Sequence, residues 1–406
     1  MAASEPEQVT GATRSGTFRR MTTGGETYFA FYPKPLPPEP QLAIGASTQD
    51  LLDTANQALG RLDGITLLLP DPDQFIYSYV RKEAVLSSQI EGTQSSLSDL
   101  LLFEHGVASG VPIEDVRETS NYIKAMSHGL DRIRGGFPLS LRLLTEIHKL
   151  LMEGGRGGHR APGEFRRTQN WIGGTRPGNA RYVPPPAHEV LQTMGALEKF
   201  LHDDPVRTPI LIKAALAHAQ FETIHPFLDG NGRIGRLLVT LLLAAEQKVL
   251  ARPLLYLSLY LKENRDEYYT RLQRVRTHGE WEEWLGFFLA GVIAVANSAT
   301  ETTRRIVQLV ENDRQQILSL GRAAGSAAQV HRIATQEIVF TIPNASKRIG
   351  LSEVTVAKAA SHLESLGIVR EVTGRPRNKL YVYGGYLALL QGGETSLAAG
   401  GRQTGD

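Results

Sequence analysis

Residues 225–236 read HPFLDGNGRIGR, and an apolar run, LLVTLLLAAE, follows directly at 237–246. The apolar run predicts a helix, and the Gly-Asn-Gly turn before it places a loop at the N-terminus of that helix. Backbone N–H groups without partners and the positive end of the helix dipole make such a terminus an anion site. Arg233 and Arg236, three residues apart in the first turn, share a face and can bind neighbouring phosphates. The stretch therefore predicts a polyphosphate site at a helix start.

The same stretch supplies two groups for chemistry at a phosphate. His225, just before the loop, can accept a proton from an attacking group, and Asp229 can hold a divalent cation. Taken singly, each feature is common, because Asp-Gly-Asn-Gly is also an ordinary turn and arginines at a helix start are usually solvated. Eight specified residues at fixed spacing, however, arise by chance on the order of once in 10^10 positions. The combination therefore indicates a phosphate-transfer site.

These residues resemble the signature of the Fic family, His-x-Phe-x-(Asp/Glu)-Gly-Asn-Gly-Arg-x-x-Arg, and match it at every specified position. The resemblance implies transfer of AMP from ATP to a Ser, Thr or Tyr hydroxyl of a target protein, or of the enzyme itself, with release of pyrophosphate. It assigns His225 as the general base and Asp229 as the Mg²⁺ ligand. Positioning and charge neutralisation, which such residues provide, are the main sources of catalysis in phosphoryl transfer.

The resemblance also implies a set of nucleotide-binding residues. The backbone amides of the Gly-Asn-Gly turn would cradle the phosphates, and the two arginines would bind the β- and γ-phosphates. A tyrosine further along the chain falls where the family often places a residue on the nucleotide, although a half-buried core position is the alternative for it. The full expected set is Gly230, Asn231, Gly232, Arg233, Ile234, Gly235, Arg236 and Tyr268.

A second motif precedes the signature, at residues 87–92, which read SSQIEG. Taken alone it is a helix end with a glycine stop. Beside the signature it matches the family's inhibitory motif, (Ser/Thr)-x-x-x-Glu-(Gly/Asn). The resemblance implies that Glu91 pairs with Arg236 and keeps it from the γ-phosphate, while Ser87 steadies the carboxylate by a hydrogen bond. A carboxylate and a guanidinium about 4 Å apart in a partly screened site attract each other by a few kcal/mol before desolvation is subtracted.

Length and composition restrict the class of protein. A chain of 406 residues suggests two or three domains, and 41% apolar with 21% charged residues is a globular composition. The net charge of +2 provides no overall attraction to nucleic acid or membrane, and the absence of cysteine excludes disulfides and cysteine nucleophiles. The N-terminus lacks a hydrophobic signal segment, and the apolar stretch at 237–245 is far shorter than the roughly 20 residues of a membrane span. We therefore expect a cytoplasmic protein without membrane contact.

Helical periodicity predicts a mainly α fold. The resemblance implies that its core is of the Fic type. The exception in the middle is the segment 163–186, whose short β-favouring runs around a Gly/Pro/Asn turn predict a hairpin. It resembles the Fic flap, which holds the target segment by strand addition, with an ordinary surface connector as the alternative. Helices are expected over 48–62, 73–90, 96–105, 113–133, 140–153, 187–202, 209–223, 233–247, 263–277 and 280–312.

The sequence pattern changes in the C-terminal part. Residues 340–390 predict two short helices joined by a glycine turn, and then a hairpin, a pattern that resembles a winged helix-turn-helix. The segment 321–329 before it predicts a linker or a frayed helix. A local basic patch suits DNA phosphates, although winged helices that only contact protein carry such patches too. The basic residues are Lys347, Arg348, Lys358, Arg370, Arg375, Arg377 and Lys379, against Glu353, Glu364 and Glu371.

These patterns divide the chain into six expected regions. They are a flexible N-terminal segment (1–40), a helical regulatory region with the inhibitory motif (41–135), a Fic catalytic core (136–300), a connecting helix or linker (301–330), a winged helix-turn-helix (331–391) and a disordered tail (392–406).

The leading hypothesis is an autoinhibited protein adenylyltransferase that uses ATP and Mg²⁺, with a homodimer as the assembly that the resemblance suggests. Three alternatives remain open. The enzyme could transfer phosphate or phosphocholine from another donor, or it could be a metal-dependent hydrolase that uses His218 and His225. In a different class, the nucleotide fold would be the ligand sensor of a DNA-binding transcriptional regulator.

Overall fold

The structure is a computed structural model that describes residues 12–67, 69, 72–107, 110–155, 157–246, 255–375 and 378–392. The chain divides into two compact units, taken here as the described residues of each range. The first unit comprises 1–60, 83–94 and 112–296, and the second comprises 61–82, 95–111 and 297–406. The division cuts across the expected regulatory region 41–135, because the long helices α1 (Ala46–Thr66) and α2 (Pro72–Ile90) each contribute residues to both units.

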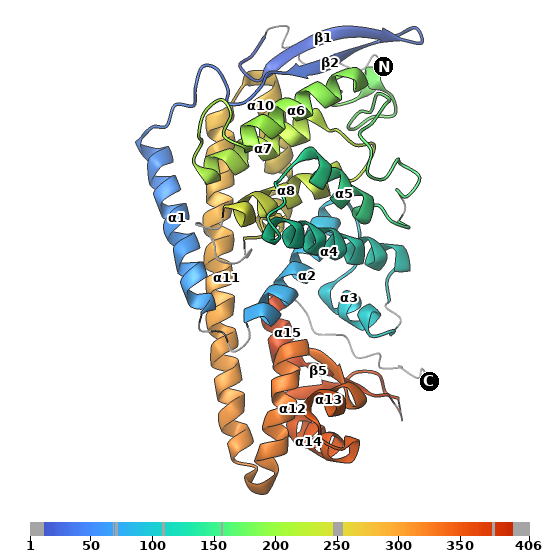
Figure 1. Ribbon diagram of the computed structural model, residues 1–406, viewed down its shortest axis with the longest axis vertical. Coiled ribbons are helices and arrows are strands. Elements are labelled where there is room, and N and C mark those ends of the chain that lie inside the picture. Colours follow the sequence, from blue (N-terminus) through green and yellow to red (C-terminus); the bar gives the residue numbers. More distant parts are fainter. Residues whose placement is uncertain are drawn as a thin grey trace, which may run out of the picture. The chain divides into compact units, whose positions relative to one another are not determined.

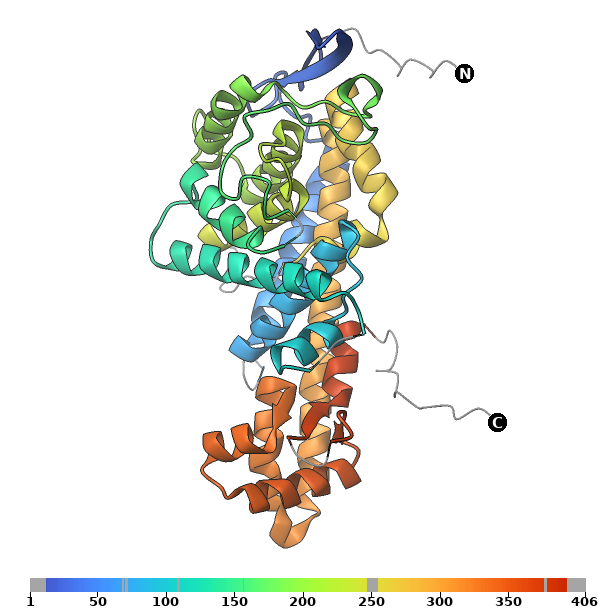
Figure 2. The same ribbon diagram turned by 90° about the vertical axis from the view of Figure 1, so that its right-hand side faces the viewer.

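The N-terminal part of the first unit is a β-hairpin (Figures 1 and 2, dark blue). Strands β1 (Gly16–Thr23) and β2 (Glu26–Pro33) are antiparallel, with Thr23 opposite Glu26. The connecting Gly24 and Gly25 have φ of +58° and +80°, the left-handed conformation that a two-residue hairpin turn requires and glycine adopts without strain. The expected flexibility of 1–40 is therefore wrong for these strands; residues 1–11 lie outside the described part.

Helices make up the remainder of the first unit, as the periodicity predicted. Helix α7 (Ile210–Ile224) is buried almost all round, and α8 (Asn231–Ala245) packs against it and against α4 (Ile113–Arg134) and α5 (Leu141–Leu151) (Figure 1). A helix that is apolar on all sides is stable only at the centre of a protein, so this pair forms the core. The other helices are α6 (Val190–Leu201), α9 (Ser258–Glu263), α10 (Arg265–His278) and the first turns of α11 (Trp281–Leu318). The helix expected over 263–277 is α10, and α9, which was not expected, lies before it. The helix expected over 187–202 begins as a 3-10 turn, η2 (Ala187–Glu189).

The segment 163–186 forms only a minimal hairpin. One antiparallel pair joins Ile172 to Tyr182, with N–H···O distances of 2.8 and 3.1 Å, and a 3-10 turn, η1 (Pro177–Asn179), lies between them. The segment also extends the N-terminal hairpin, because the Phe31 N–H of β2 donates to the Val183 carbonyl at 3.0 Å. The predicted hairpin is therefore present, anchored along one side by β2.

The second unit contains the elements expected near the C-terminus. Helices α13 (Ile342–Ile349) and α14 (Glu353–Ser365) are joined by a turn at Gly350, and the Ser352 hydroxyl caps α14 by accepting the Thr355 N–H. A small antiparallel sheet has the order β3 (Val339–Thr341), β5 (Leu380–Tyr383), β4 (Val369–Glu371). The helix-turn-helix and the hairpin strands thus form, while their assignment to the winged-helix class stays a prediction. The unit also contains α3 (Leu97–Glu104), capped by Ser96 as expected, and α15 (Gly384–Gln391).

The connection before these elements is helical. Helix α11 continues to Leu318, and a 3-10 turn, η3 (Gly321–Ala323), leads into α12 (Ala324–Glu337). Of the two alternatives for 321–329, the helix is thus the one observed, because Ala327 and Val330 are buried and stabilise it by packing. The predicted tail 392–406 and Arg377 lie outside the described residues, Gly392 excepted.

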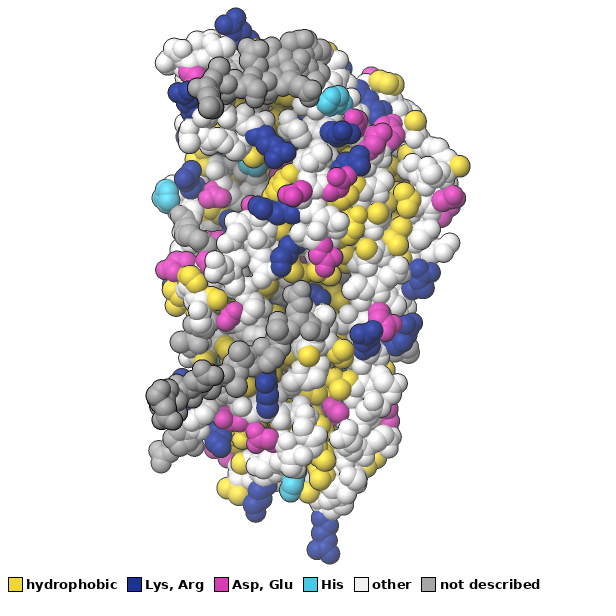
Figure 3. Space-filling view, turned by 180° about the vertical axis from the view of Figure 1, so that it is seen from behind, with side chains coloured by type: hydrophobic (Ala, Val, Ile, Leu, Met, Phe, Trp, Pro, Cys, Tyr) yellow, Lys and Arg dark blue, Asp and Glu magenta, His cyan; other side chains and the backbone are white. Residues whose placement is uncertain are grey.

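Helix α11 is long and apolar enough to cross a membrane by length and composition alone, and no other helix in the described part of the chain is. Its first turns bury Trp281, Trp284, Leu285, Phe288 and Leu289 inside the first unit, as a core helix does. On the face of the molecule shown in Figure 3, Lys and Arg side chains are interspersed with Asp and Glu. Charges of both signs are therefore mixed on this face.

We expect Trp284→Ala to destabilise the first unit strongly. Trp284 is fully buried against His218 and Tyr268, and its indole N–H donates to the Ala215 carbonyl at 2.8 Å. Truncation of such a residue costs about 3–5 kcal/mol, whereas Leu191→Ala, at a side chain that is 68% exposed, should change stability by less than about 0.5 kcal/mol. Thermal unfolding of the two variants beside the unmodified chain measures the difference, and equal melting temperatures would contradict the packing described.

Candidate active site

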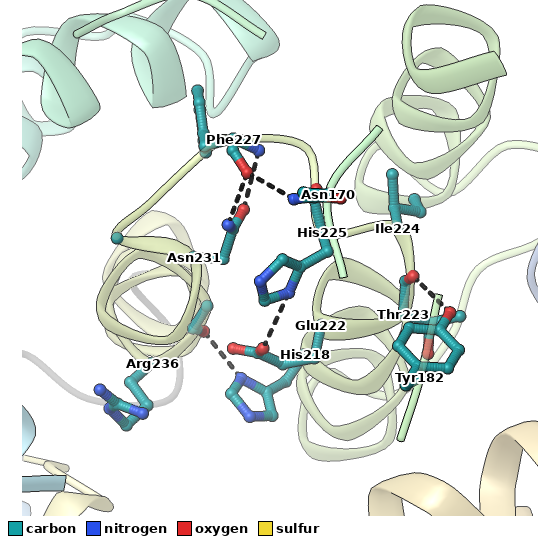
Figure 4. Close-up of polar contacts among 12 residues, drawn as sticks. Asn170, Tyr182, His218, Glu222, Thr223, Ile224, His225, Phe227, Asn231 and Arg236 are labelled. Atoms are coloured by element: carbon teal, nitrogen blue, oxygen red, sulfur yellow. Dashed lines mark hydrogen bonds and ion pairs between the residues drawn. The ribbon is translucent and has the colours of Figure 1, made fainter. Parts of the chain in front are cut away.

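The signature loop joins the two central helices through two left-handed residues. His225 ends α7 with φ +49° and ψ +60°, and Gly230 precedes α8 with φ +75°. The Asn231 side chain closes the loop by accepting the Phe227 N–H at 2.9 Å and donating to the Phe227 carbonyl at 2.8 Å (Figure 4). The loop therefore has a defined shape before any ligand binds, and the N–H groups in the first turn of α8 have no carbonyl partner within the helix.

Residues far from the signature hold this loop in place. Arg166 donates from Nε to the His225 carbonyl at 2.9 Å, and Asn170 donates to the Phe227 carbonyl at 2.9 Å. His148 stacks on Phe227 at 3.8 Å, accepts the Gly163 N–H on Nδ1 and donates from Nε2 to the Asp229 carbonyl. Burial lowers the pKa of His148 to about 4, so the ring is neutral and can both accept and donate. The sequence analysis missed these residues, because they are separated from the loop by tens of positions and belong to no motif.

His225 is an uncharged imidazole at neutral pH. Burial, with the nearby charges of Arg276 and Arg166, lowers the pKa of His225 to about 3. A neutral ring has a lone pair free to accept a proton, as a general base must. The nearest carboxylate is that of Glu222, whose Oε2 lies 3.8 Å from His225 Nδ1 (Figure 4).

Arg236 is fully engaged by α2. It is 3% exposed, and its Nη2 lies 2.7 Å from Glu91 Oε1. The ion pair predicted between Glu91 and Arg236 is therefore present. Burial alone would raise the pKa of the Glu91 carboxyl, but the Arg236 guanidinium outweighs this effect and lowers that pKa below its ordinary value.

Ser87 has a different role from the one expected. It does not steady the Glu91 carboxylate; it accepts from Arg236 twice, at 2.9 Å from Nε to its hydroxyl and at 2.9 Å from Nη2 to its carbonyl. One helical turn of α2 thus presents a hydroxyl, a carbonyl and a carboxylate to one guanidinium. The correction follows from the planar fork of arginine donors, which satisfies several acceptors at once.

The Glu91 carboxylate also lies at the predicted anion site. A Cβ atom on Gly232 would be 2.2 Å from Glu91 Oε1, so the carboxylate is in direct contact with the first turn of α8. A helix N-terminus stabilises a negative group there, whether a carboxylate or a phosphate. The chain therefore supplies its own anion to the site where phosphates were expected.

The other signature arginine and the expected metal ligand are paired as well. Arg233 Nη1 lies 3.3 Å from Glu118 Oε2, and Nη2 lies 3.8 Å from Asp229 Oδ1. Asp229 Oδ1 accepts the Gly230 N–H at 2.6 Å, and its side chain remains 45% exposed. The described residues contain no group of three or more acidic or histidine side chains arranged around a metal. A single exposed carboxylate still fits Mg²⁺, which commonly binds through one or two carboxylates together with substrate phosphates and water.

Three residues of the expected nucleotide set lie on the buried side of α8. Ile234 is completely buried, the Gly235 carbonyl accepts from His218 Nδ1 at 2.8 Å, and Tyr268 is 1% exposed with its hydroxyl 2.9 Å from His218 Nε2. Tyr268 is thus a core residue, the alternative expected for it, because it packs against His218 on α7 and Trp284 on α11; contact of the three residues with a nucleotide stays a prediction. The contacts of His218 also oppose the hydrolase alternative, since both its nitrogens are already hydrogen-bonded.

We expect Ser87→Ala to lower stability and Ser88→Ala to leave it nearly unchanged. Both serines are fully buried, but the Ser87 hydroxyl binds Arg236, whereas the Ser88 hydroxyl has no hydrogen-bond partner among the described residues. A hydrogen bond to a charged group contributes about 1.5–3 kcal/mol, and deleting an unpaired hydroxyl costs little. Thermal unfolding without nucleotide measures both; an equal loss for the two variants would show that Ser87 does not hold Arg236.

The chain was compared with known families and structures. Residues 49–131 match the Fic/DOC family N-terminal model, and residues 138–243 match the Fic/DOC family model. The protein adenylyltransferase Fic of Drosophila erecta is 30% identical over 187 residues, which are 44% of this chain and 34% of that protein. The protein of the same name from Culex quinquefasciatus is 34% identical over 160 residues, 37% of this chain and 27% of that protein.

The matched region thus spans about a third of the length of these curated relatives. Among solved structures, a Fic family protein from Desulfovibrio desulfuricans G20 has a TM-score of 0.55 at 20% sequence identity. It covers 84% of this chain and 97% of its own, and it shows the fold. Two family models that follow each other along the chain thus agree with a solved Fic fold, and the chain contains a Fic/DOC N-terminal domain and a Fic/DOC domain.

Proposed function

We propose that this protein is an ATP-dependent protein adenylyltransferase that its own Glu91 holds inactive. The adenylyltransferase relatives support enzyme activity of the Fic kind. The observation that supports an inhibited state is the position of the Glu91 carboxylate, which contacts both Arg236 and Gly232 at the N-terminus of α8. A carboxylate in that position excludes a phosphate, because two anions cannot share one small cationic site.

In the proposed reaction, the hydroxyl oxygen of the target attacks the α-phosphorus of ATP. The new O–P bond forms as the bond from the α-phosphorus to the bridging oxygen breaks, and pyrophosphate leaves with that electron pair. His225 takes the hydroxyl proton on Nε2, for which its low pKa leaves it correctly deprotonated. Mg²⁺ held by Asp229 would neutralise charge on the phosphates. Arg236, once free of Glu91, would bind the terminal phosphate and align the α-phosphorus.

The minimal hairpin supports binding of an extended target segment beside this site. In its pair with Tyr182, Ile172 directs its own N–H and carbonyl inward, so the N–H and carbonyl groups of Trp171 and Gly173 point to the opposite edge. Trp171 is 39% exposed at that edge. A target strand carrying the Ser, Thr or Tyr could pair there through its main chain.

The second unit gives less support to the alternative of a DNA-binding transcriptional regulator. Arg348 pairs with Glu337, and Lys358 on the exposed side of α14 has Glu353 and Glu364 on the same helix. The positive charge of these two residues is thus partly neutralised, which weakens their attraction to DNA phosphates. We therefore prefer the enzyme.

Glu91→Gly should raise the rate of AMP transfer. The substitution frees Arg236 for the terminal phosphate and leaves the anion site at Gly232 open to a phosphate. The ion pair is worth a few kcal/mol, and each 1.36 kcal/mol is tenfold in rate, so we expect a gain of about ten- to thousandfold. Intact-mass spectrometry after incubation with ATP and Mg²⁺ measures the adenylyl groups added to the protein itself, and labelled ATP measures those added to other proteins.

The double variant Glu91→Gly with Arg236→Ala is the matched control. It removes the inhibitory carboxylate but also the arginine that the carboxylate restrains, so the gain should disappear. Equal rates for the unmodified chain and Glu91→Gly at saturating ATP would mean that Glu91 is only a helix end.

His225→Ala in the Glu91→Gly background should reduce transfer by about 10²–10⁴-fold, the usual contribution of a positioned general base. ATP binding should stay close to that of Glu91→Gly, because the base acts on the hydroxyl and not on the triphosphate. Transfer rates and calorimetric ATP titration separate the two effects. Comparable turnover with and without His225 would remove it from the mechanism.

A further inference from the structure

Glu222 is a buried carboxyl group that neither the signature nor the inhibitory motif includes. It lies on α7 one turn before His225, is 6% exposed, and places Oε2 3.8 Å from His225 Nδ1 (Figure 4). Glu222 Oε1 and His225 Nδ1 are both buried without a hydrogen-bond partner among the described residues. Burial of a carboxyl oxygen without a partner costs free energy, so its retention here calls for a function.

The charged and titratable groups around Glu222 come from four helices. His218 on α7 is committed to Gly235 and Tyr268, and Arg236 on α8 gives Nε and Nη2 to Ser87 and Glu91. Arg276 on α10 donates to the Glu222 main-chain carbonyl at 3.0 Å, not to the side chain. Glu91, directly after α2, raises the pKa of Glu222, and Glu222 raises that of Tyr268 on α10. His225 Nδ1 lies 3.8 Å from Glu222 Oε2 and has no hydrogen-bond partner among the described residues, although the Glu222 main-chain carbonyl also acts on the His225 ring.

We propose that Glu222 is the positioning residue of the general base, orienting His225 with Nδ1 protonated and stabilising its positive charge during transfer. This inference rests on the proposed adenylyl transfer. A proton on Nδ1 leaves the lone pair on Nε2 for the target hydroxyl. When Nε2 takes that proton the ring becomes an imidazolium, and the carboxylate 3.8 Å from Nδ1 balances its charge.

The surroundings of His225 explain why it needs such a partner. The ring is buried beside the cationic side chains of Arg166 and Arg276, which disfavour an imidazolium. Without a carboxylate nearby, accepting the hydroxyl proton would place an unpaired charge in a buried site. Burial raises the pKa of Glu222 to about 7, against the opposing charge of Arg236, so the supporting carboxylate ionises near neutrality. Transfer should therefore fall as the pH drops through that range, although His225 itself stays neutral.

The test compares Glu222→Ala and Glu222→Gln, each in the Glu91→Gly background. We expect kcat to fall about ten- to hundredfold for Glu222→Ala with KM for ATP unchanged. Glu222→Gln keeps an acceptor for Nδ1–H but no charge, so it should retain more activity and lose the acid limb of the kcat–pH profile. Since Glu91 raises the pKa of Glu222, its removal should place that limb below pH 7.

Glu83→Gln in the same background is the matched control. Glu83 is also buried, and burial also raises its pKa to about 7, but it faces Ser258 and Tyr122 instead of His225. Its variant should keep the acid limb. An unchanged kcat and acid limb in Glu222→Ala would show that the main chain alone orients His225, and the proposal would be wrong.

A second measurement is independent of turnover and therefore distinguishes failure of this proposal from failure of the proposed function. In protein labelled with ¹⁵N-histidine, the His225 resonances, identified by their loss in His225→Ala, report which ring nitrogen is protonated. We expect Nδ1–H in Glu91→Gly at pH 8 and a mixture of both tautomers after Glu222→Ala. An unchanged tautomer would overturn the orienting role even if Glu91→Gly transferred no AMP.

Discussion

The contact between the Glu91 carboxylate and the Arg236 guanidinium organises the candidate site; the two groups are 2.7 Å apart, with the Arg236 side chain buried and the Glu91 side chain 36% exposed. An ion pair with one buried partner adds little net stability, because desolvation offsets much of the attraction. Breaking it is costly, however, since either charge would remain unpaired. The pair therefore favours one arrangement of α2 on α8, and ligands that compete for Arg236 must supply a negative charge of their own. A triphosphate does so, and in the proposed mechanism inhibition and substrate binding therefore involve the same guanidinium.

Burial determines the protonation of the residues around that pair. The pKa values of His148, His218 and His225 are all lowered, to about 4, 4 and 3, so three neutral rings surround the loop at physiological pH. Two of them hold structure by donating from one nitrogen and accepting on the other. His225 differs because its Nδ1 has no hydrogen-bond partner among the described residues and lies 3.8 Å from the Glu222 carboxylate; in the proposed mechanism its Nε2 takes the proton. The same desolvation that makes the scaffold rigid thus keeps the base unprotonated.

Local patterns predicted much of the architecture. The central helices, the Ser96 and Ser352 caps, the glycine turn of the helix-turn-helix and the Glu91–Arg236 pair all depend on short-range spacing or on a motif. The N-terminal hairpin was not predicted, although its Gly-Gly turn is a local signal. Residues 1–25 are rich in Gly, Ser and Thr and contain few large apolar side chains, a composition typical of flexible segments. For Tyr268 the sequence left a core position and a nucleotide contact open, because nothing in Arg265–Tyr269 tells which of two adjacent tyrosines packs into the core.

The amino-acid sequence by itself determined which groups the loop carries: a histidine, a carboxylate, flexible glycines and two arginines at a helix start, with the carboxylate of Glu91 upstream. Only the tertiary structure decided which side chains those groups meet. Ser87 binds Arg236 and not Glu91, Arg166 and His148 hold the loop, and Glu222 faces His225. These contacts arise because segments from distant parts of the chain pack together. The physical reason is that hydrogen bonds and ion pairs act over a few ångströms in space, whereas spacing along the chain predicts neighbours only within a helix turn or a hairpin.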